Sequence, residues 1–337
     1  MAPRIGILVL HTTPMSIRIY VEKIRERLPA HGIESFVFDN PCDIPQADVY
    51  WDPRTGGGRA PTRKLVGIHA PLVVTLHDVA HLSLPWLEFY PTFLRAANGR
   101  FEGMRVARDW RQAEPWVSHI IVPSVVTRDE TCRFLKLDPG KISVIAHGVD
   151  HDQFTVTDRH NTSIRSFQPY FLHISQYQKR KNVERLLAAY MAIPRGGRPR
   201  LVMKLIGYGG PKYQDGVSYL DGIISPAEIA ALYAGAIAFV FPSLNEGFGL
   251  PVLEAMASGC PVITSKDTAC AEVVGEAALL VDPYSVSELT RALQQMSEDE
   301  ALRGDLVSKG LIRSQEFQWD KSAEAHAEVF KKVLIRR

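Results

Sequence analysis

Residues 241 to 265 read F-P-S-L-N-E-G-F-G-L-P-V-L-E-A-M-A-S-G-C-P-V-I-T-S, and this stretch predicts a strand, a loop and a helix in succession. A buried strand is expected to end at Phe241. Pro251 stands where a helix begins, because the fixed φ of proline suits the first helical turn. The loop between them carries Glu246 with Gly247 and Gly249, so it is both acidic and glycine-rich.

The predicted loop is suited to an anionic group such as a diphosphate. Amides at the start of a helix carry the positive end of its dipole, and glycines let a ligand approach the backbone. Glu254 lies about one turn inside the helix, where both its oxygens can bind a ribose diol while Glu246 lies near a phosphate-linked sugar. This spacing suits a nucleotide sugar. The alternative is a plain strand, loop and helix with acids that face solvent.

The chain on either side of this stretch predicts two parallel α/β layers, because short apolar strands alternate with amphipathic helices. A polar stretch, residues 155–163, predicts a linker between them. We therefore expect domains at 1–158 and 159–318, and a helix at 319–337 that packs back across both. The segment P-R-T-G-G-G-R-A-P, residues 53–61, predicts a surface loop by its composition.

Composition excludes several classes of protein. The 337 residues are 46% hydrophobic and 23% charged, which fits a globular enzyme of two domains, and the net charge of +2 gives no support for nucleic-acid binding. The four cysteines are scattered without a C-x-x-C pair, which argues against a zinc site or a disulfide framework and favours a reducing cytosol. The apolar run I-G-I-L-V-L near the N-terminus is too short to span a membrane.

The motif Glu246, seven residues, Glu254 resembles the signature of the family 4 retaining glycosyltransferases of GT-B fold. The resemblance covers nearly the whole chain. It includes A-L-Y-A-G-A-I-A-F-V-F-P-S before the motif, A-E-V-V-G-E-A-A-L-L-V-D-P after it, V-P-S-V-V-T-R-D-E in the first domain and the late F-Q-W-D. It implies an α/β fold of two Rossmann-like domains that face each other across a donor-binding cleft.

The resemblance also assigns roles to residues of the loop and helix. Glu246 is implied to contact the hydroxyls of the donor sugar, and Glu254 the ribose. The donor's sugar and distal phosphate are implied to lie on backbone amides beside Gly247, those of Phe248, Gly249 and Leu250.

A basic pair is expected after the first strand of the second domain, and Q-Y-Q-K-R-K-N supplies Arg180 and Lys181. A leaving diphosphate gains negative charge as its bond to the sugar breaks, and no metal-binding cluster is evident in the sequence, so cations are needed there. Lys179 is a further candidate. We expect neither a metal ion nor a cofactor. The alternative is a solvated basic turn at the start of a helix.

His77 follows the strand L-V-V-T-L, at the strand end where open α/β sheets place their ligands. A lone histidine is more often a hydrogen-bonded structural residue, but the family has a histidine here that faces the donor sugar. We therefore assign His77 a catalytic role in contacting the sugar and its transition state. His81 is a weaker candidate, and Asp78 is expected to orient the loop.

These features predict a metal-independent, retaining hexosyltransferase of polysaccharide biosynthesis. The donor is expected to be GDP-mannose, because H-D-V-A-H and the motif look most like mannosyl-type members, and the acceptor a hydroxyl of a saccharide or lipid-linked saccharide. Three alternatives stay open. They are a sugar-nucleotide epimerase, a catalytically silent binding protein of the same fold and, because G-Y-G-G at residues 207–210 follows a strand, a nicotinamide-dependent dehydrogenase.

The acceptor is expected in the N-terminal domain, where a predicted helix carries several arginines: Arg95, Arg100, Arg105, Arg108 and Arg111. Such a face could touch anionic lipid or a phosphorylated acceptor; the alternative is a solvated helix face. A cytoplasmic location is expected, with a peripheral contact at the inner membrane face and the oligomeric state both left open.

Overall fold

The computed structural model describes residues 2–57, 59–90, 92–156, 169–210 and 214–335. The chain forms two compact units. The N-terminal unit comprises Met1–Gly148 together with Phe317–Arg337, and the C-terminal unit comprises Val149–Glu316. The expected boundary after residue 158 lies outside the described residues, and the division between the units falls at Gly148, ten residues earlier than expected.

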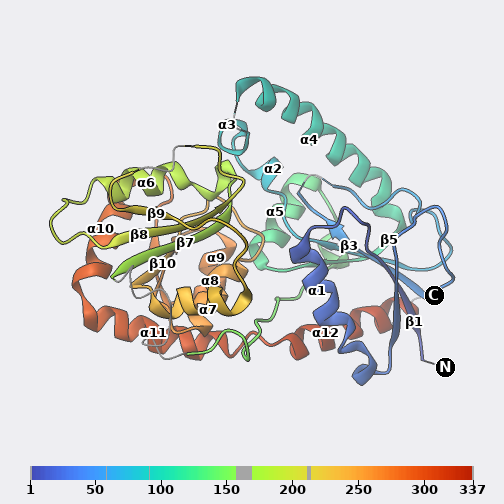
Figure 1. Cartoon of the computed structure of the whole chain (residues 1–337). Coiled ribbons are helices and arrows are strands. Elements are labelled where there is room, and N and C mark those ends of the chain that lie inside the picture. Colours follow the sequence, from blue (N-terminus) through green and yellow to red (C-terminus); the bar gives the residue numbers. More distant parts are fainter. Residues whose placement is uncertain (1, 58, 91, 157–168, 211–213, 336–337) are drawn as a thin grey trace. The chain divides into compact units, whose positions relative to one another are not determined.

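The N-terminal unit contains a parallel sheet with strand order β2-β1-β3-β4-β5-β6 (Figure 1). Its inner strand Leu72–Leu76 is apolar but for one threonine and buried along its whole length, as expected for a parallel sheet covered by helices on both sides. The strands are β1 (Arg4–Leu8), β2 (Glu34–Phe38), β3 (Val49–Thr55), β4 (Leu72–Leu76), β5 (Val117–Val122) and β6 (Ile142–Val144).

Helices of the N-terminal unit cover both faces of this sheet. One face packs on α1 and the C-terminal helix, and the other packs on residues that include Val106 and Trp110 of α4. The helices are α1 (Met15–Arg25), α2 (Ala80–Ser83), α3 (Trp86–Phe89), α4 (Phe93–Ala113), α5 (Val125–Leu135) and α12 (Trp319–Ile335), with 3-10 turns at Leu28–His31, Glu114–Trp116 and Pro139–Lys141.

The prediction of a surface loop at residues 53–61 is wrong for its first three residues. Pro53, Arg54 and Thr55 belong to β3 and are buried, and the chain turns only after them, where Gly56 pairs with Arg59. Thr55 extends the ladder because its side-chain hydroxyl donates to the carbonyl of Thr75 at 2.6 Å. Composition alone misplaced the end of the strand. Pro53 lies where the register between β3 and β4 shifts, between Asp52 and Thr55, and strands accept proline at such irregularities.

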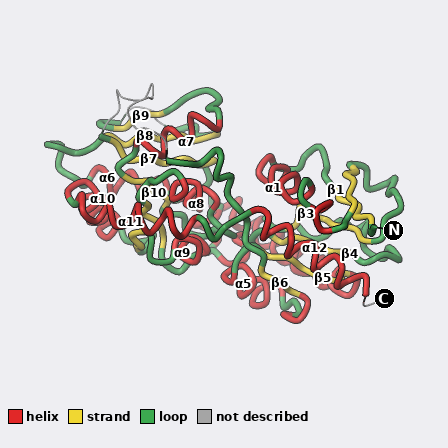
Figure 2. Tube along the Cα trace, turned by 90° about the horizontal axis from the view of Figure 1, so that it is seen from below, coloured by secondary structure: helices red, strands yellow, loops and turns green. Residues whose placement is uncertain are grey.

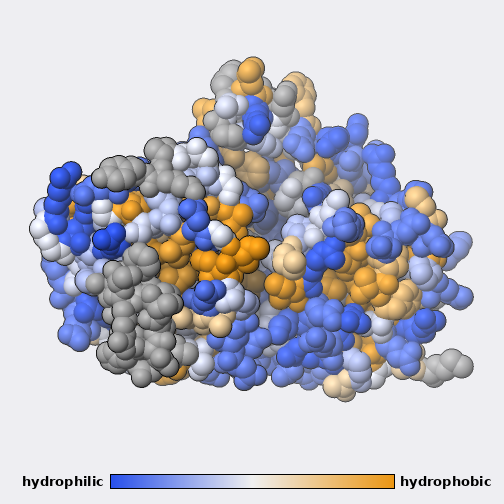
Figure 3. All heavy atoms as spheres, in the orientation of Figure 1, coloured by the Kyte–Doolittle hydropathy of each residue, from blue (hydrophilic) through white to orange (hydrophobic). Residues whose placement is uncertain are grey.

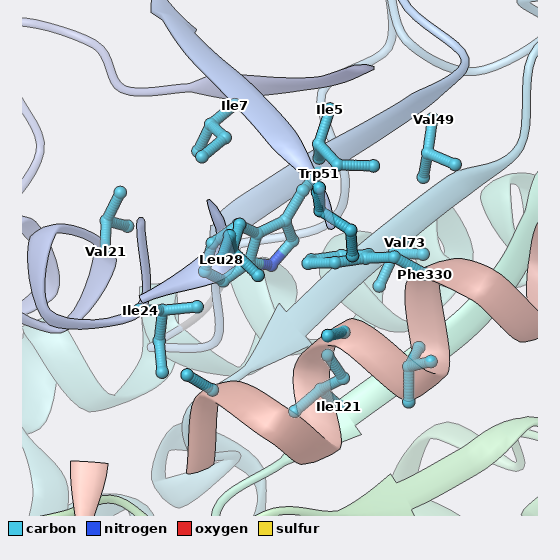
Figure 4. Close-up of a cluster of buried hydrophobic side chains, with 14 of the residues drawn as sticks. Ile5, Ile7, Val21, Ile24, Leu28, Val49, Trp51, Val73, Ile121 and Phe330 are labelled. Carbon is cyan, nitrogen blue, oxygen red and sulfur yellow. The ribbon is translucent and has the colours of Figure 1, made fainter. Parts of the chain in front are cut away.

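The C-terminal helix α12 completes the core of the N-terminal unit. Figure 4 shows the ring of Phe330 beside the indole of Trp51, with ring centroids 5.6 Å apart. Nδ1 of His326 donates to the carbonyl of Ser322 at 2.6 Å, so Nε2 of the same ring is an acceptor. The hydroxyl of Tyr20 therefore donates to that Nε2 at 2.5 Å. The helix therefore packs on the N-terminal unit.

The C-terminal unit contains a second parallel sheet, with strand order β12-β11-β10-β7-β8-β9 (Figure 2). Numbered within the unit, this order is 6-5-4-1-2-3, which is the Rossmann order. The strands are β7 (Tyr170–Gln176), β8 (Arg200–Ile206), β9 (Val217–Tyr219), β10 (Ala238–Phe241), β11 (Val262–Ser265) and β12 (Ala278–Val281).

Several helices of the C-terminal unit begin at residues whose side chains cap the first helical turn. At α7, Ser225 and Glu228 form a reciprocal capping box, and Pro226 follows in the first helical position. Serine and aspartate side chains likewise cap α10 and α11. The helices are α6 (Val183–Met191), α7 (Pro226–Gly235), α8 (Leu250–Ala257), α9 (Ala269–Val274), α10 (Val286–Glu298) and α11 (Glu300–Ser314), with a 3-10 turn at Lys179–Lys181.

The predicted arginine-bearing helix is α4, and Arg95, Arg105, Arg108 and Arg111 are exposed on it. The side chain of Arg100 falls outside the described residues. Figure 3 shows hydrophobic and hydrophilic residues intermingled where α3 and α4 lie, and Leu94, Phe101 and Met104 are among the exposed apolar side chains. Among the described residues, none of the helices has the length and apolar character that crossing a membrane requires.

Candidate active site

Two loops meet where the connections of the C-terminal sheet diverge, between β7 and β10. Open parallel sheets bind ligands at this position, beyond the carboxyl ends of the strands. The 3-10 turn after β7 supplies Arg180 and Lys181, and the loop after β10 supplies Glu246. Arg180 Nη1 lies 2.9 Å from Glu246 Oε2, and Lys181 Nζ donates to the other carboxylate oxygen. The structure therefore brings together three of the predicted site residues.

Backbone contacts hold these two loops in place. The amide of Leu244 donates to the carbonyl of Arg180 at 2.7 Å, and Arg180 Nη1 donates in turn to the carbonyl of Asn245 at 2.9 Å. Asn182 has a left-handed backbone with φ of +61°, which asparagine tolerates better than most residues. Its side-chain amide donates to the carbonyls of Pro242 and Pro283, at 3.0 and 2.6 Å. Sequence analysis missed Asn182, although an asparagine directly after a basic turn was the available signal.

The charges of this cluster are strongly coupled. Burial alone would raise the pKa of Glu246, but the cations of Arg180 and Lys181 outweigh it and lower that pKa to about 2. Burial lowers the pKa of Lys181, and the carboxylate of Glu246 opposes this shift. Lys181 Nζ also lies 4.7 Å from the ring centroid of Phe241, which adds a cation–π contact. Glu246 is thus a buried anion balanced by two cations.

Helix α8 begins directly beyond this cluster. Gly249 is its N-cap and has φ of +111°, and a Cβ there would lie 2.8 Å from Cys270 Sγ, so only glycine fits. The first amides of a helix have no carbonyl partner within it, and they carry the positive end of its dipole. The predicted donor residues Gly247, Phe248 and Leu250 lie in this same turn, with Pro251 in the first turn of the helix as expected. Sequence analysis missed Cys270, which comes from α9 and lacked any local signal.

Glu254 lies on α8, and its environment differs from that of Glu246. Burial raises the pKa of Glu254 to about 7, and a hydrogen bond from Tyr233 Oη, 3.3 Å from Oε2, offsets only part of this shift. No ion pair to Glu254 is found among the described residues. The two acids of the motif therefore differ in charge near neutral pH, since Glu246 is fully ionised and Glu254 titrates. Tyr233 was not singled out from the sequence, because it lies on α7, in a different element.

The raised pKa of Glu254 predicts a pH-dependent stability. The folded protein holds this proton more tightly than the unfolded chain, whose ordinary value is 4.5, so stability from this group is lost as pH rises from 4.5 through about 7. Between pH 5 and 8 we expect the free energy of unfolding of the wild type to fall by roughly 2 to 3 kcal/mol more than that of Glu254→Gln. Urea unfolding followed by circular dichroism at both pH values measures this difference. Equal losses in the two proteins would contradict it.

His77 belongs to the N-terminal unit and follows β4, as predicted. Its Nε2 donates to the carbonyl of Pro53 at 2.7 Å, so this nitrogen carries the proton and Nδ1 is the acceptor. Burial lowers its pKa, and its ring lies edge-on to Tyr20 with centroids 5.3 Å apart. Asp78 orients the neighbouring loop, since its Oδ1 accepts from the amides of Gly57 and Ala80. The sugar contact assigned to His77 stays a prediction.

His81 is buried on α2, and burial lowers its pKa. Neither of its ring nitrogens has a hydrogen-bond partner among the residues the structure describes. The described residues also contain no group of three or more histidine, cysteine or acidic side chains placed to hold a metal ion.

Comparison with protein families divides the chain much as its fold does. Residues 156–312 match the family model described as "Glycosyl transferases group 1", and residues 51–153 match "Glycosyltransferase Family 4". Two parallel-sheet units with these matches define a GT-B architecture. Together the two models match most of the chain, which is similar to the family 4 glycosyltransferases in both of its units.

Individual relatives agree with this assignment. The chain is 37% identical over 169 residues to O-antigen chain mannosyltransferase B of Escherichia coli, covering 46% of this chain and 44% of that protein. It is 30% identical over 203 residues to the serotype-specific mannosyltransferase WbdA of Escherichia coli, covering 54% of this chain and 25% of that protein. The matches thus span less than half the length of these curated relatives. Sucrose-phosphate synthase from Thermosynechococcus elongatus has the same fold, with a TM-score of 0.79, 20% identity and coverage of 99% and 100% of the two chains.

Proposed function

We propose that this protein transfers mannose from GDP-mannose to a hydroxyl of a saccharide or lipid-linked saccharide, with retention of configuration and without a metal ion. The observation that carries the proposal is the pairing of Glu246 with Arg180 and Lys181 at the topological switch point, directly before the N-terminus of α8. The similarity to family 4 glycosyltransferases supports glycosyl transfer, and the names of the two Escherichia coli relatives support mannose. The choice of GDP and of the cytoplasm as the place of reaction belongs to the proposal.

The cluster suits the charge changes of glycosyl transfer. When the bond to the anomeric carbon breaks, negative charge grows on the departing diphosphate and positive charge grows on the sugar. Arg180, Lys181 and the amides at the start of α8 stabilise the departing diphosphate, in place of a metal ion. The carboxylate of Glu246, with its pKa of about 2, stays ionised and accepts hydrogen bonds from the sugar hydroxyls.

Retention follows from attack on the face that the diphosphate leaves. The acceptor hydroxyl approaches that face, a bond forms between its oxygen and the anomeric carbon, and its proton passes to the departing phosphate oxygen. No side-chain nucleophile is needed, and the cations lower the energy of this charge-separated state. Glu254 binds the ribose diol of the donor, preferentially as the carboxylate, so nucleotide affinity is expected to rise through its pKa of about 7.

The proposal is tested by the melting temperature of the protein with GDP, UDP, ADP and dTDP and with their sugar conjugates, each measured with and without EDTA. A ligand that binds only the folded state raises that temperature. We expect GDP and GDP-mannose to give the largest rise in melting temperature, and EDTA to leave that rise unchanged. In Glu254→Ala the ribose contact is lost, so the apparent affinity for the nucleotide is expected to fall at least tenfold.

Each outcome of that panel has a distinct meaning. A larger response to another nucleotide would replace GDP in the proposal, and a response abolished by EDTA would remove metal independence. No response to any nucleotide would overturn the donor site and favour a silent relative of the same fold. Product analysis with and without an acceptor separates transfer from epimerisation. Without an acceptor, an epimerase forms an epimeric nucleotide sugar, whereas a transferase can only hydrolyse its donor.

A further inference from the structure

A cavity of about 530 Å³ lies in the N-terminal unit. It is bounded by Leu10, directly after β1, by Asp52 and Arg54 of β3, and by the end of α4. The strand order β2-β1-β3 makes the boundary between β1 and β3 the point where the connections of this sheet diverge. Open parallel sheets bind ligands at such points. The cavity lies against the face of the sheet that α4 covers, beside the point where the connections diverge.

The floor of the cavity is a buried ion pair with one unused donor. The carboxylate of Asp52 accepts from Arg54 Nε at 3.0 Å and Nη2 at 3.3 Å, and from the amide and hydroxyl of Thr62 at 3.1 and 2.7 Å. Arg54 is only 9% exposed, yet its Nη1 has no partner among the described residues. The acid of this pair is saturated while the guanidinium still has hydrogens to donate.

Two further guanidiniums lie at the rim. The side chain of Arg59 is exposed and makes no hydrogen bond or ion pair within the part of the chain that the structure describes. Arg63 Nη2 lies 3.4 Å from Asp109 Oδ1. This ion pair is weak, because the Arg63 side chain is exposed to solvent. Among the lining residues, three arginines thus face two aspartates, which leaves a positive excess. Guanidinium groups bind phosphate through paired hydrogen bonds, so this lining matches a phosphate group.

The loop that carries Arg59 is in contact with the predicted sugar-contact residue. Gly56 lies so close to the strand end that a Cβ there would be 2.9 Å from the amides of both His77 and Asp78. The amide of Gly57 donates to Asp78 Oδ1 at 3.2 Å. A ligand that fixes Arg59 therefore also fixes the loop packed against His77.

We propose that this cavity binds a phosphate group carried by the acceptor substrate. The proposal rests on the proposed function in naming the acceptor as the source of that phosphate. A soluble sugar phosphate and a lipid-linked saccharide phosphate share this chemistry. Arg54 and Arg59 are the residues that bind it, and they act here as specificity-determining residues for the acceptor.

Titration calorimetry with inorganic phosphate tests the site, at constant ionic strength and with the best nucleotide of the panel present so that the candidate donor site is filled. We expect Arg59→Ala to weaken phosphate binding about tenfold, as the loss of one charge-assisted contact predicts. Arg25→Ala, a partly exposed arginine on α1 of the same unit that pairs with Glu22, is the matched control and is expected to bind as the wild type does. Arg54→Lys keeps the charge beside Asp52 and is expected to weaken phosphate binding several-fold, because lysine lacks the paired, planar donors of the guanidinium group.

Equal affinity in Arg59→Ala and wild type, an equal loss in Arg25→Ala, or no phosphate binding by the wild type would each overturn the site. Mannose 1-phosphate and phosphatidylcholine vesicles containing phosphatidic acid distinguish the two sources. Binding of either probe that depends on Arg59 supports the site and names the source, whereas Arg59-independent binding of both refutes it. Nucleotide binding is measured separately, through Glu254→Ala, so failure of the donor site and failure of this cavity are distinguishable.

Discussion

Glu246→Gln is expected to lower the free energy of unfolding of the C-terminal unit by about 3 kcal/mol and to abolish transfer. The substitution leaves Lys181, which is 8% exposed, without its anion, and an unpaired buried charge is strongly destabilising. The difference in the free energy of unfolding between wild type and Glu246→Gln should vanish at low pH. A carboxyl whose pKa is lowered from 4.5 to about 2 stabilises the protein above pH 4.5, and this contribution is lost as pH falls through 2.

Urea unfolding can assign this loss to one unit. All five tryptophans, Trp51, Trp86, Trp110, Trp116 and Trp319, belong to the N-terminal unit, so their fluorescence follows that unit alone. Circular dichroism follows both units. We expect Glu246→Gln to shift the circular-dichroism transition more than the fluorescence transition.

A matched double variant separates stability from chemistry. Glu246→Gln combined with Lys181→Met removes both charges of the pair, and it should recover at least half of the lost stability while staying inactive. Recovery of activity together with stability would show that Glu246 acts only through folding. A single variant as stable as the wild type would contradict the buried-charge argument.

Lys181→Ala is expected to lower the rate of nucleoside diphosphate release from the donor by about 10²- to 10³-fold, because a cation beside the departing diphosphate is lost. Donor hydrolysis without acceptor provides the assay, so the identity of the acceptor does not matter. Added Mg²⁺ or Mn²⁺ should not restore the rate if the protein supplies the charge itself. Lys309→Ala, a paired surface lysine of α11, is the control and should be unchanged.

Two results would contradict this prediction. A rate within a few-fold of wild type would show that Lys181 does not stabilise the departing diphosphate. Arg180 and the start of α8 would then supply that stabilisation. Rescue by a divalent cation would instead indicate that a metal ion can occupy the same place. Because Glu246 loses one partner in this variant, its stability is measured alongside the rate.

The sequence predicted the features that depend on neighbouring residues. The run from Phe241 to Pro251 gave a strand, a glycine-rich loop and a helix start, and the structure has β10 ending at Phe241 and α8 beginning at Leu250. Arg180, Lys181 and Glu246 were named from motif and chemistry before their contact was known. The resemblance to family 4 glycosyltransferases is confirmed by the two family models, and the predicted roles of individual residues stay predictions.

What the sequence missed depends on packing between distant segments. Tyr233 and Cys270 reach the candidate site from α7 and α9, and no periodicity marks them. Strand β9, Val217–Tyr219, has three residues, all of them partly buried, so its pattern is too short to detect. Pro53 was assigned to a loop because composition cannot show that neighbouring strands bury it.

The split of the N-terminal unit into Met1–Gly148 and Phe317–Arg337 bears on how the protein folds during synthesis. Its core needs Phe330 and Val333 of α12, which leave the ribosome after the whole C-terminal unit, whereas the C-terminal unit is one continuous segment. The usual N-to-C order of domain completion is therefore reversed here. The apolar face of the nascent N-terminal unit stays uncovered until α12 has been synthesised, so a stop codon before α12 would leave that face open to aggregation and chaperone capture.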